Sequence, residues 1–194
     1  VDVWADSSQR TVHYPLCHDR RTLLWFGNQR AVEFHPTLVP HGATTTGELV
    51  VDLDPPDGAG FDRVVAAAHP VRAAVKASGA TGLHLVVPLS EPLPVEDAFA
   101  ATRAVCARAA ALAPDVATTA FIRDDRGGRV FLDPTRVGGA TLAAPYSPRA
   151  RPGLPVSFPL PWGALDRVTP ADCTVGTVAG LLAGRPTWAE LRPG

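Results

Sequence analysis

The alternation of apolar and polar positions predicts short strands mixed with helices. Residues 48–54 (ELVVDLD) read as a strand rich in β-branched residues, closed by a Pro-Pro-Asp-Gly turn. Residues 95–112 give the clearest helix, because apolar residues recur at helical spacing between Pro94 and Pro114. The apolar positions of this helix are Phe99, Val105, Cys106, Ala109 and Leu112. These two segments alone predict a mixture of sheet and helix.

Weaker patterns of the same kind fill the rest of the chain. We predict strands at 30–35, 71–78, 83–89 and 129–133, an apolar segment at 22–27, a helix at 61–68, a proline-punctuated extended stretch at 145–161, and a helix around Val178–Leu182. Strands and helices on one core indicate an α+β fold. A length of 194 residues suits one domain, which we place over residues 1–194.

Composition excludes several classes of protein. Apolar residues make up 46% and charged residues 19%, as in average globular chains, and no apolar run approaches the roughly 18 residues of a membrane span. The chain opens without a signal-peptide pattern. Cys17, Cys106 and Cys173 form no CxxC pair, so neither a disulfide framework nor a zinc site is indicated. We therefore expect a soluble, cytoplasmic chain without a membrane partner, with Cys106 in its core.

Charge is distributed unevenly although the formal net charge is only −1. Arginines outnumber acidic residues between residues 123 and 151, whereas acidic residues outnumber arginines between residues 1 and 62. An evenly spread charge would argue against a nucleic-acid partner. Because the charge is instead concentrated in a basic segment, a nucleic-acid partner is not excluded.

Two carboxylates stand two residues apart at the end of the strand at 48–54. Because strand side chains alternate between faces, Asp52 and Asp54 share a face while Leu53 points into the core. Neighbouring carboxylates repel each other unless a cation compensates, and hard oxygen ligands suit Mg²⁺ or Mn²⁺. Asp133 ends a second strand and is the natural third carboxylate. The alternative is a strand that runs into an acidic turn and binds no metal.

A second group of polar residues surrounds the turn from Ser78 to His84. Its two glycines expose backbone N–H groups, Ser78 adds a hydroxyl, and His84 is able to donate to an oxyanion. That combination suits phosphate oxygens. A hairpin with glycines at positive φ and an exposed histidine explains the same residues without a ligand.

Two arginines and another histidine complete the candidates. Prolines keep residues 145–153 extended, so Arg149 and Arg151 project on one side, where guanidinium groups match phosphate. The alternative is a solvated basic loop. His35 follows Glu33 by two residues and shares a strand face with it, an arrangement that is more often structural than catalytic.

Four segments follow one another along the chain: TLLWFGNQRAVEFHP, LVVDLDPPDG, VKASGATGLHLVVPL and RVFLDPTRVGGATLAAPYSPRARPGLPVSFPLPW. In this order they resemble the polymerase domain of bacterial ligase D, a member of the archaeo-eukaryotic primase-polymerase superfamily. The resemblance covers roughly residues 20–165. It implies a primase-polymerase catalytic core, α+β, with a mixed β-sheet and an RRM-like unit that forms one wall of a cleft.

The resemblance also implies roles for particular residues. It implies four catalytic residues: Asp52, Asp54, Asp133 and His35. The three aspartates among them would hold two Mn²⁺ or Mg²⁺ ions. The resemblance implies a second group that contacts the nucleotide or the template: Ser78, His84, Arg126, Arg149 and Arg151. The implied reaction is attack of a primer 3′-hydroxyl on the α-phosphate of a nucleoside triphosphate, with release of pyrophosphate. Its setting is primed or gapped DNA in non-homologous end joining, with an ATP-dependent DNA ligase and an end-binding protein as partners.

This sequence departs from the family pattern at several points, so we consider two alternative functions. Members usually carry a further N-terminal segment with basic residues for a DNA 5′-phosphate, so we expect weak binding of DNA ends by this chain. Thr81 stands where many members have Lys or Arg. One alternative is a weakly active member that binds nucleic acid or a ligase partner. The other is a metal-dependent phosphoesterase that uses the same carboxylates.

Overall fold

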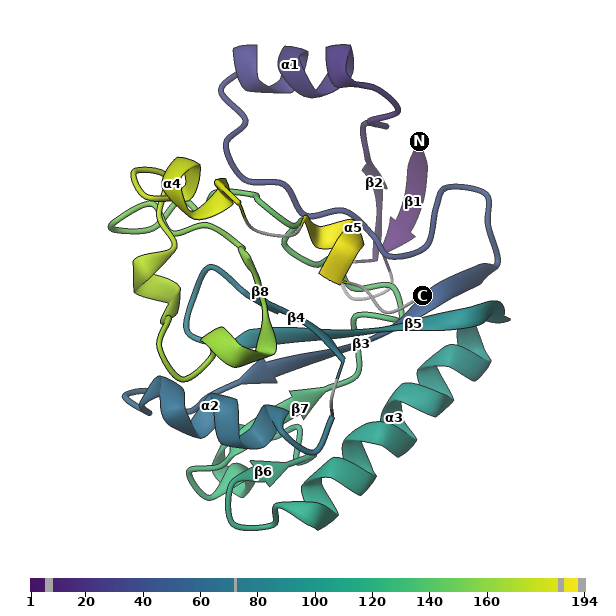
Figure 1. Cartoon of the computed structure of the whole chain (residues 1–194). Helices are drawn as coiled ribbons and strands as arrows, with labels where there is room; N and C mark the ends of the chain where they lie inside the picture. The colour runs from purple at the N-terminus through teal and green to yellow at the C-terminus, as the bar shows by residue number, and fades with distance from the viewer. Residues whose placement is uncertain (6–8, 72, 185–186, 192–194) are drawn as a thin grey trace. The chain divides into compact units, whose positions relative to one another are not determined.

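The computed structural model describes residues 1–194 except 6–8, 72, 185–186 and 192–194. The chain divides into two compact units, Val1–Val32 and Glu33–Gly194. Figure 1 shows the elements of each unit. The placement of one domain over residues 1–194 stays a prediction.

The first unit holds an antiparallel strand pair and one helix. Strand β1 (Asp2–Ala5) pairs with β2 (Arg10–His13), and helix α1 spans Arg20–Asn28. The apolar segment predicted at 22–27 lies inside this helix. The side chain of Asp19 caps the helix by accepting a hydrogen bond from Thr22 N at 2.8 Å, which satisfies one of the backbone donors exposed at a helix start.

The second unit is built on a six-stranded mixed sheet in the order β6-β7-β3-β5-β4-β8. Its strands are β3 (Thr45–Asp54), β4 (Ala74–Ala77), β5 (Leu83–Pro94), β6 (Ala117–Thr118), β7 (Val130–Asp133) and β8 (Pro159–Leu160). All neighbours are antiparallel except β6 and β7, which are parallel. The predicted α+β class and mixed sheet are confirmed.

Two longer helices, α2 (Phe61–Ala68) and α3 (Val95–Leu112), lie on the same side of this sheet (Figure 1). Shorter helices follow: η1 (Arg123–Arg126), η2 (Trp162–Ala164), η3 (Pro170–Asp172), α4 (Val178–Leu182) and α5 (Trp188–Leu191). Cys106 and Ala109 are buried as predicted, whereas Leu112 is 56% exposed because it stands at the last turn of α3. None of the described helices is long and apolar enough to cross a membrane.

The strand predicted at residues 30–35 is wrong, because that segment has no regular secondary structure. Its backbone is used by a distant loop: Phe34 N donates to Ser147 Oγ at 2.8 Å, and Ala144 N donates to Phe34 O at 3.0 Å. The sheet therefore gains no strand here. Instead, residues 33–36 and 142–147 lie side by side next to the site described below.

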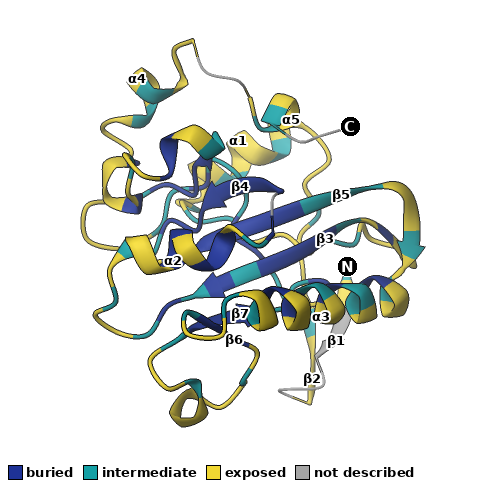
Figure 2. Ribbon diagram, turned by 60° about the horizontal axis from the view of Figure 1, so that its bottom comes forward, coloured by how far each residue is buried: buried dark blue, intermediate teal, exposed yellow. Residues whose placement is uncertain are grey.

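Apolar residues cover both faces of the central strands where these are buried, at Leu83–Val86 of β5 and around Leu49–Leu53 of β3, whereas the far end of β5 is exposed (Figure 2). Val51 and Leu53 belong to a large cluster that includes α2 and part of α3. Val50 and Val86 point to the other face and pack in a smaller cluster with Val137. Polar side chains on this second face therefore sit in partly desolvated surroundings.

Candidate active site

A row of four polar residues crosses the sheet on the face of the smaller cluster. Register pairs Lys76 of β4 with His84 of β5, His84 with Asp52 of β3, and Asp52 with Asp133 of β7. Directly paired residues of antiparallel strands project on one face with adjacent side chains. Four strands, of which β4 and β5 are consecutive in the chain, thus bring a lysine, a histidine and two carboxylates together.

Arg136 forms ion pairs with the two carboxylates of this row. Its Nη2 lies 2.7 Å from Asp52 Oδ2 and 3.6 Å from Asp133 Oδ2, and its Nη1 donates to Thr141 O at 3.2 Å. Only 13% of either carboxylate side chain is exposed. Burial raises the pKa of Asp52, the Arg136 charge opposes that rise, and the charges of Asp133 and Asp54 add to it. The site therefore holds repelling carboxylates that require a compensating cation.

Asp54 shares the face of Asp52 but takes a different arginine. Arg126 Nη1 donates to Asp54 Oδ2 at 3.1 Å, while its other nitrogens donate to Ala120 O and Phe121 O. The guanidinium carbon also lies 4.2 Å from the centre of the Phe131 ring, where the face of the ring attracts the cation. This arginine is fixed by the protein itself, and 46% of the Asp54 side chain is exposed.

Asp52, Asp54 and Asp133 carry carboxylate oxygens on one face of the sheet. Oxygen ligands of this kind are those that Mg²⁺ and Mn²⁺ prefer. Among the described residues, however, no three acidic, histidine or cysteine side chains converge on one point that could hold an ion. The reason is visible in the ion pairs, since Arg136 joins Asp52 and Asp133 while Arg126 binds Asp54.

The turn between β4 and β5 is organised around the hydroxyl of Ser78, which accepts hydrogen bonds from Ala80 N at 3.1 Å and Gly82 N at 3.2 Å. Gly79 has φ +73°, a conformation that suits glycine. A Cβ at Gly82 would lie 2.0 Å from Leu53 O, so only glycine allows this close approach to β3. The turn is held against the strand that carries the carboxylates.

Arg149 reaches the same place from the loop after β7 and is fixed on two sides. Its Nε donates to Glu33 Oε1 at 2.7 Å, and its Nη1 donates to Ser78 O at 2.8 Å. Glu33 also accepts from Ala150 N at 2.7 Å and lies 2.6 Å from His35 Nε2. Partial burial raises the pKa of Glu33, but these hydrogen bonds and the Arg149 charge outweigh it and lower the pKa to about 2. Glu33 is thus an ionised anchor for Arg149.

An open pocket collects most of the residues predicted for the site. Its charged and polar lining comprises His35, Asp52, Asp54, Ser78, Thr81, His84, Arg136, Thr141 and Arg149. Asp133 and Arg126 lie behind this lining, each joined to it by an ion pair. Arg151 is exposed and does not line the pocket, so it does not project beside Arg149 as predicted. The chain turns tightly between the two arginines, where Arg151 N donates to Arg149 O at 2.8 Å.

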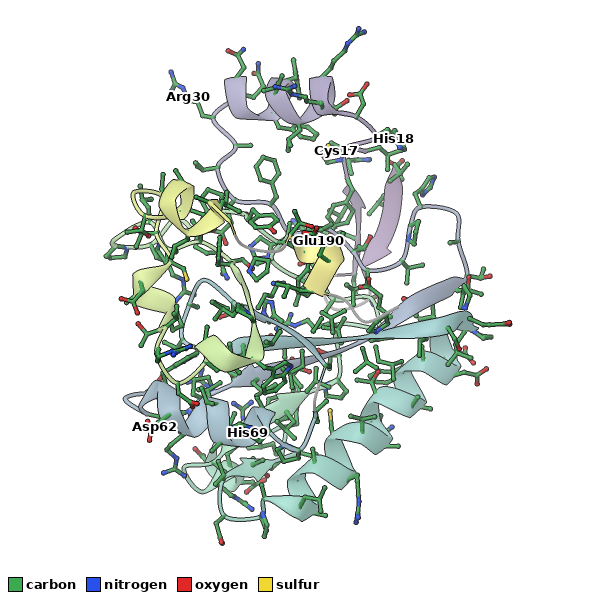
Figure 3. The ribbon with its side chains drawn as sticks, in the orientation of Figure 1. Cys17, His18, Arg30, Asp62, His69 and Glu190 are labelled. Carbon is green, nitrogen blue, oxygen red and sulfur yellow. The ribbon has the colours of Figure 1, made fainter. Side chains whose placement is uncertain are left out.

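Three residues of the site carried no role in the sequence reasoning. Arg136 and Glu33 were visible as charges close to predicted residues, and Lys76 is the one lysine of the sequence, inside an apolar strand. A buried strand position for a lone lysine is the signal that could have pointed to Lys76. The histidines outside the site lie at the surface, including His18 and His69, which Figure 3 labels before α1 and at the end of α2.

Comparison with known proteins gives one consistent family. A family model described as the primase-polymerase domain of LigD matches residues 1–188. The multifunctional non-homologous end joining protein LigD of Mycolicibacterium smegmatis is 33% identical over 168 residues, covering 78% of this chain and 22% of that protein. The bifunctional LigD of Bacillus subtilis is 32% identical over 175 residues, covering 84% and 29%. The chain thus spans less than a third of the length of these curated relatives.

A solved structure agrees with the sequence comparison. The polymerase domain of Mycobacterium tuberculosis ligase D, determined in complex with DNA, superposes with a TM-score of 0.79 at 26% identity. The match covers 99% of this chain and 74% of that one. The predicted primase-polymerase fold is confirmed, and the resemblance extends beyond the segments that carried it in the sequence.

Proposed function

Because the chain belongs to the family of LigD primase-polymerase domains, we propose that it adds nucleotides to the 3′-hydroxyl of a DNA primer during repair by non-homologous end joining. The observation that carries this proposal is a single pocket that joins the carboxylates of β3 to the Ser78–Gly82 turn and to Arg149. Phosphoryl transfer needs positioned charge more than reactive side chains, and this pocket supplies it.

The triphosphate of the incoming nucleotide would bind between the Ser78–Gly82 turn and Arg149. The N–H groups of Ala80 and Gly82 already donate to Ser78 Oγ, so the turn would contact phosphate oxygens through its remaining N–H groups, at Gly79 and Thr81. Arg149 donates two of its five N–H groups to Glu33 and Ser78, which fixes the orientation of the guanidinium group. Its remaining N–H groups would donate to phosphate oxygens. His84 lines the same pocket and supplies a ring nitrogen toward it.

Asp52 and Asp133, with Asp54 beside them, would hold the divalent metal ions. Bound Mn²⁺ or Mg²⁺ in such a site neutralises phosphate charge and activates the attacking hydroxyl. Arg136 holds Asp52 and Asp133 next to each other in the metal-free chain through contacts at 2.7 and 3.6 Å. Arg126 contacts Asp54 at 3.1 Å.

The partners follow from the names of the relatives and belong to the proposal. Those proteins are end-joining LigD proteins, and this chain matches only 22% and 29% of the length of two of them. We propose primed or gapped DNA as the second substrate, and an ATP-dependent DNA ligase with an end-binding protein as partners in the same repair event.

Primer extension tests the proposal. We expect Mn²⁺-dependent addition, to a gapped duplex, of the nucleotide complementary to each of the four template bases. Asp52→Asn removes a proposed metal ligand and should lower the rate by roughly 10³-fold. The matched control is Asp62→Asn on the exposed start of α2 (Figure 3), which should extend normally.

Three other outcomes count against the proposal. Degradation of labelled DNA without added nucleotide indicates the phosphoesterase alternative. DNA binding without extension indicates the weakly active binding module. Equal rates for Asp52→Asn and the wild type exclude the carboxylates from the reaction.

A further inference from the structure

Lys76 is one of the most deeply buried side chains in the protein and touches none of the site's carboxylates directly. Only 1% of the residue is exposed, and the side chain lies on β4 behind the pocket lining. A buried ammonium group is costly unless it is fully hydrogen-bonded. The proposed phosphate and metal contacts do not involve Lys76, so they do not explain why a lysine occupies this buried position in the polar row.

Among the residues that the structure describes, Lys76 has three hydrogen-bond partners. Its Nζ contacts His84 Nδ1, Ala143 O at 2.8 Å and Ser157 Oγ at 2.7 Å. The Ser157 hydroxyl donates its own proton to Ala77 O at 3.1 Å, so it accepts from Lys76. A carbonyl oxygen also only accepts. An ammonium group has three protons, which leaves the third for His84 Nδ1.

With Lys76 as an ammonium group, this count assigns one tautomer to the histidine ring. If Nδ1 accepts from Lys76, the proton of the neutral ring sits on Nε2. A hydrogen on Nε2 also suits the other side of the ring, because a lone pair there would face a carboxylate oxygen of Asp52. Nε2 lies 3.4 Å from Asp52 Oδ1, on the side of the pocket.

We propose that Lys76 is a positioning residue that holds His84 in the Nε2–H tautomer, so that the ring presents a hydrogen-bond donor to the pocket. The occupant that this donor fits is an anionic oxygen, either of Asp52 or of a bound triphosphate. In this tautomer Nε2 has no lone pair for a metal ion. The tautomer itself follows from the apo protein, and only the contact with triphosphate rests on the proposed function.

The opposite arrangement is chemically possible and makes the proposal testable. A neutral Lys76 amine would accept a proton from Nδ1 of His84, and the Nε2 lone pair would then face the pocket. Such a ring could bind a metal but could not donate to phosphate. The two arrangements differ in which ring nitrogen carries hydrogen.

Long-range ¹H–¹⁵N correlation spectra of the metal-free, nucleotide-free protein distinguish the two arrangements. Burial lowers the pKa of Lys76 to about 7, so spectra are recorded at about pH 6. His84→Gln assigns the signals by their disappearance. We expect a protonated Nε2 and an unprotonated Nδ1 in the wild type, and a mixture of tautomers in Lys76→Met. Ser157→Ala, the matched control, removes another partner of Lys76 and should keep the wild-type pattern.

A protonated Nδ1 in the wild type overturns the proposal, and this result needs no variant to fold. A pure Nε2–H tautomer in folded Lys76→Met overturns it as well, because the lysine would then not set the tautomer. In a second measurement, Lys76→Met should bind a nucleoside triphosphate roughly tenfold more weakly than the wild type. Unchanged affinity overturns the role of the presented N–H in binding, whereas a wild type that binds no nucleotide counts against the proposed function alone.

Discussion

Replacing Glu33 by glutamine tests how strongly the protein fixes Arg149 in the pocket. The carboxylate accepts from Arg149 Nε and from Ala150 N, both at 2.7 Å. In Glu33→Gln the charge is lost, and the amide group would turn a donor toward either Arg149 or Ala150. One of these two contacts must therefore break.

The magnitude follows from the titration of Glu33. Its pKa falls from 4.5 to about 2 on folding, which corresponds to roughly 3 kcal/mol of stabilisation. Because 27% of the side chain remains exposed, solvent screening reduces this to about 1–2 kcal/mol. A carboxyl with a depressed pKa stabilises the fold fully above pH 4.5 and loses that contribution as the pH falls through about 2.

Urea denaturation between pH 7 and pH 2, followed by tryptophan fluorescence, provides the assay. We expect Glu33→Gln to be less stable than the wild type by about 1–2 kcal/mol near neutral pH, with the difference shrinking toward pH 2. Glu91→Gln, an exposed residue of β5, is the control and should differ little from the wild type. A loss that does not change with pH, or no loss, would refute the assignment of Glu33 as an ionised anchor.

Three further predictions follow from the same contacts. Arg149→Lys should weaken nucleotide binding roughly tenfold in a titration, since an ammonium cannot keep both anchoring contacts and a donor for phosphate; unchanged binding removes Arg149 from the site. Gly82→Ala should cost about 2–3 kcal/mol in denaturant unfolding, because its Cβ would meet a carbonyl of β3 at 2.0 Å, whereas Gly47→Ala meets nothing within 4 Å; equal stability contradicts the close approach. In thiol-labelling kinetics Cys106, whose pKa burial raises to about 12, should react only after unfolding, unlike the exposed Cys17; rapid labelling of both contradicts the burial.

Elements with a complete local signal were predicted correctly from the sequence. The strand at 48–54, the helix at 61–68 and the helix at 95–112 carry their own periodicity and end signals, and the structure confirms them as β3, α2 and α3. The segment at 30–35 has a strand-like pattern but finds no strand to pair with. Its backbone bonds with a loop more than a hundred residues away, which no local pattern encodes.

The candidate site likewise contains residues that the local sequence predicts and residues whose role depends on contacts between distant segments. The shared face of Asp52 and Asp54 follows from strand alternation alone, and the turn at Ser78 follows from its glycines. The pairing of Arg136 with two carboxylates depends on the register of two strands, β3 and β7, and on the loop after β7, so it could not be predicted. Lys76 shows the same limit, because its meaning depends on lying opposite His84.

The central claim is that the pocket of β3, the Ser78–Gly82 turn and Arg149 binds the metal ions and triphosphate of a polymerase. A crystal structure with Mn²⁺ and a non-hydrolysable nucleoside triphosphate, using the anomalous signal of manganese, tests it most directly. The account predicts manganese bound by Asp52 and Asp133, with the triphosphate against the turn and Arg149. Manganese and triphosphate bound elsewhere, with the Arg136 ion pairs intact, would contradict it.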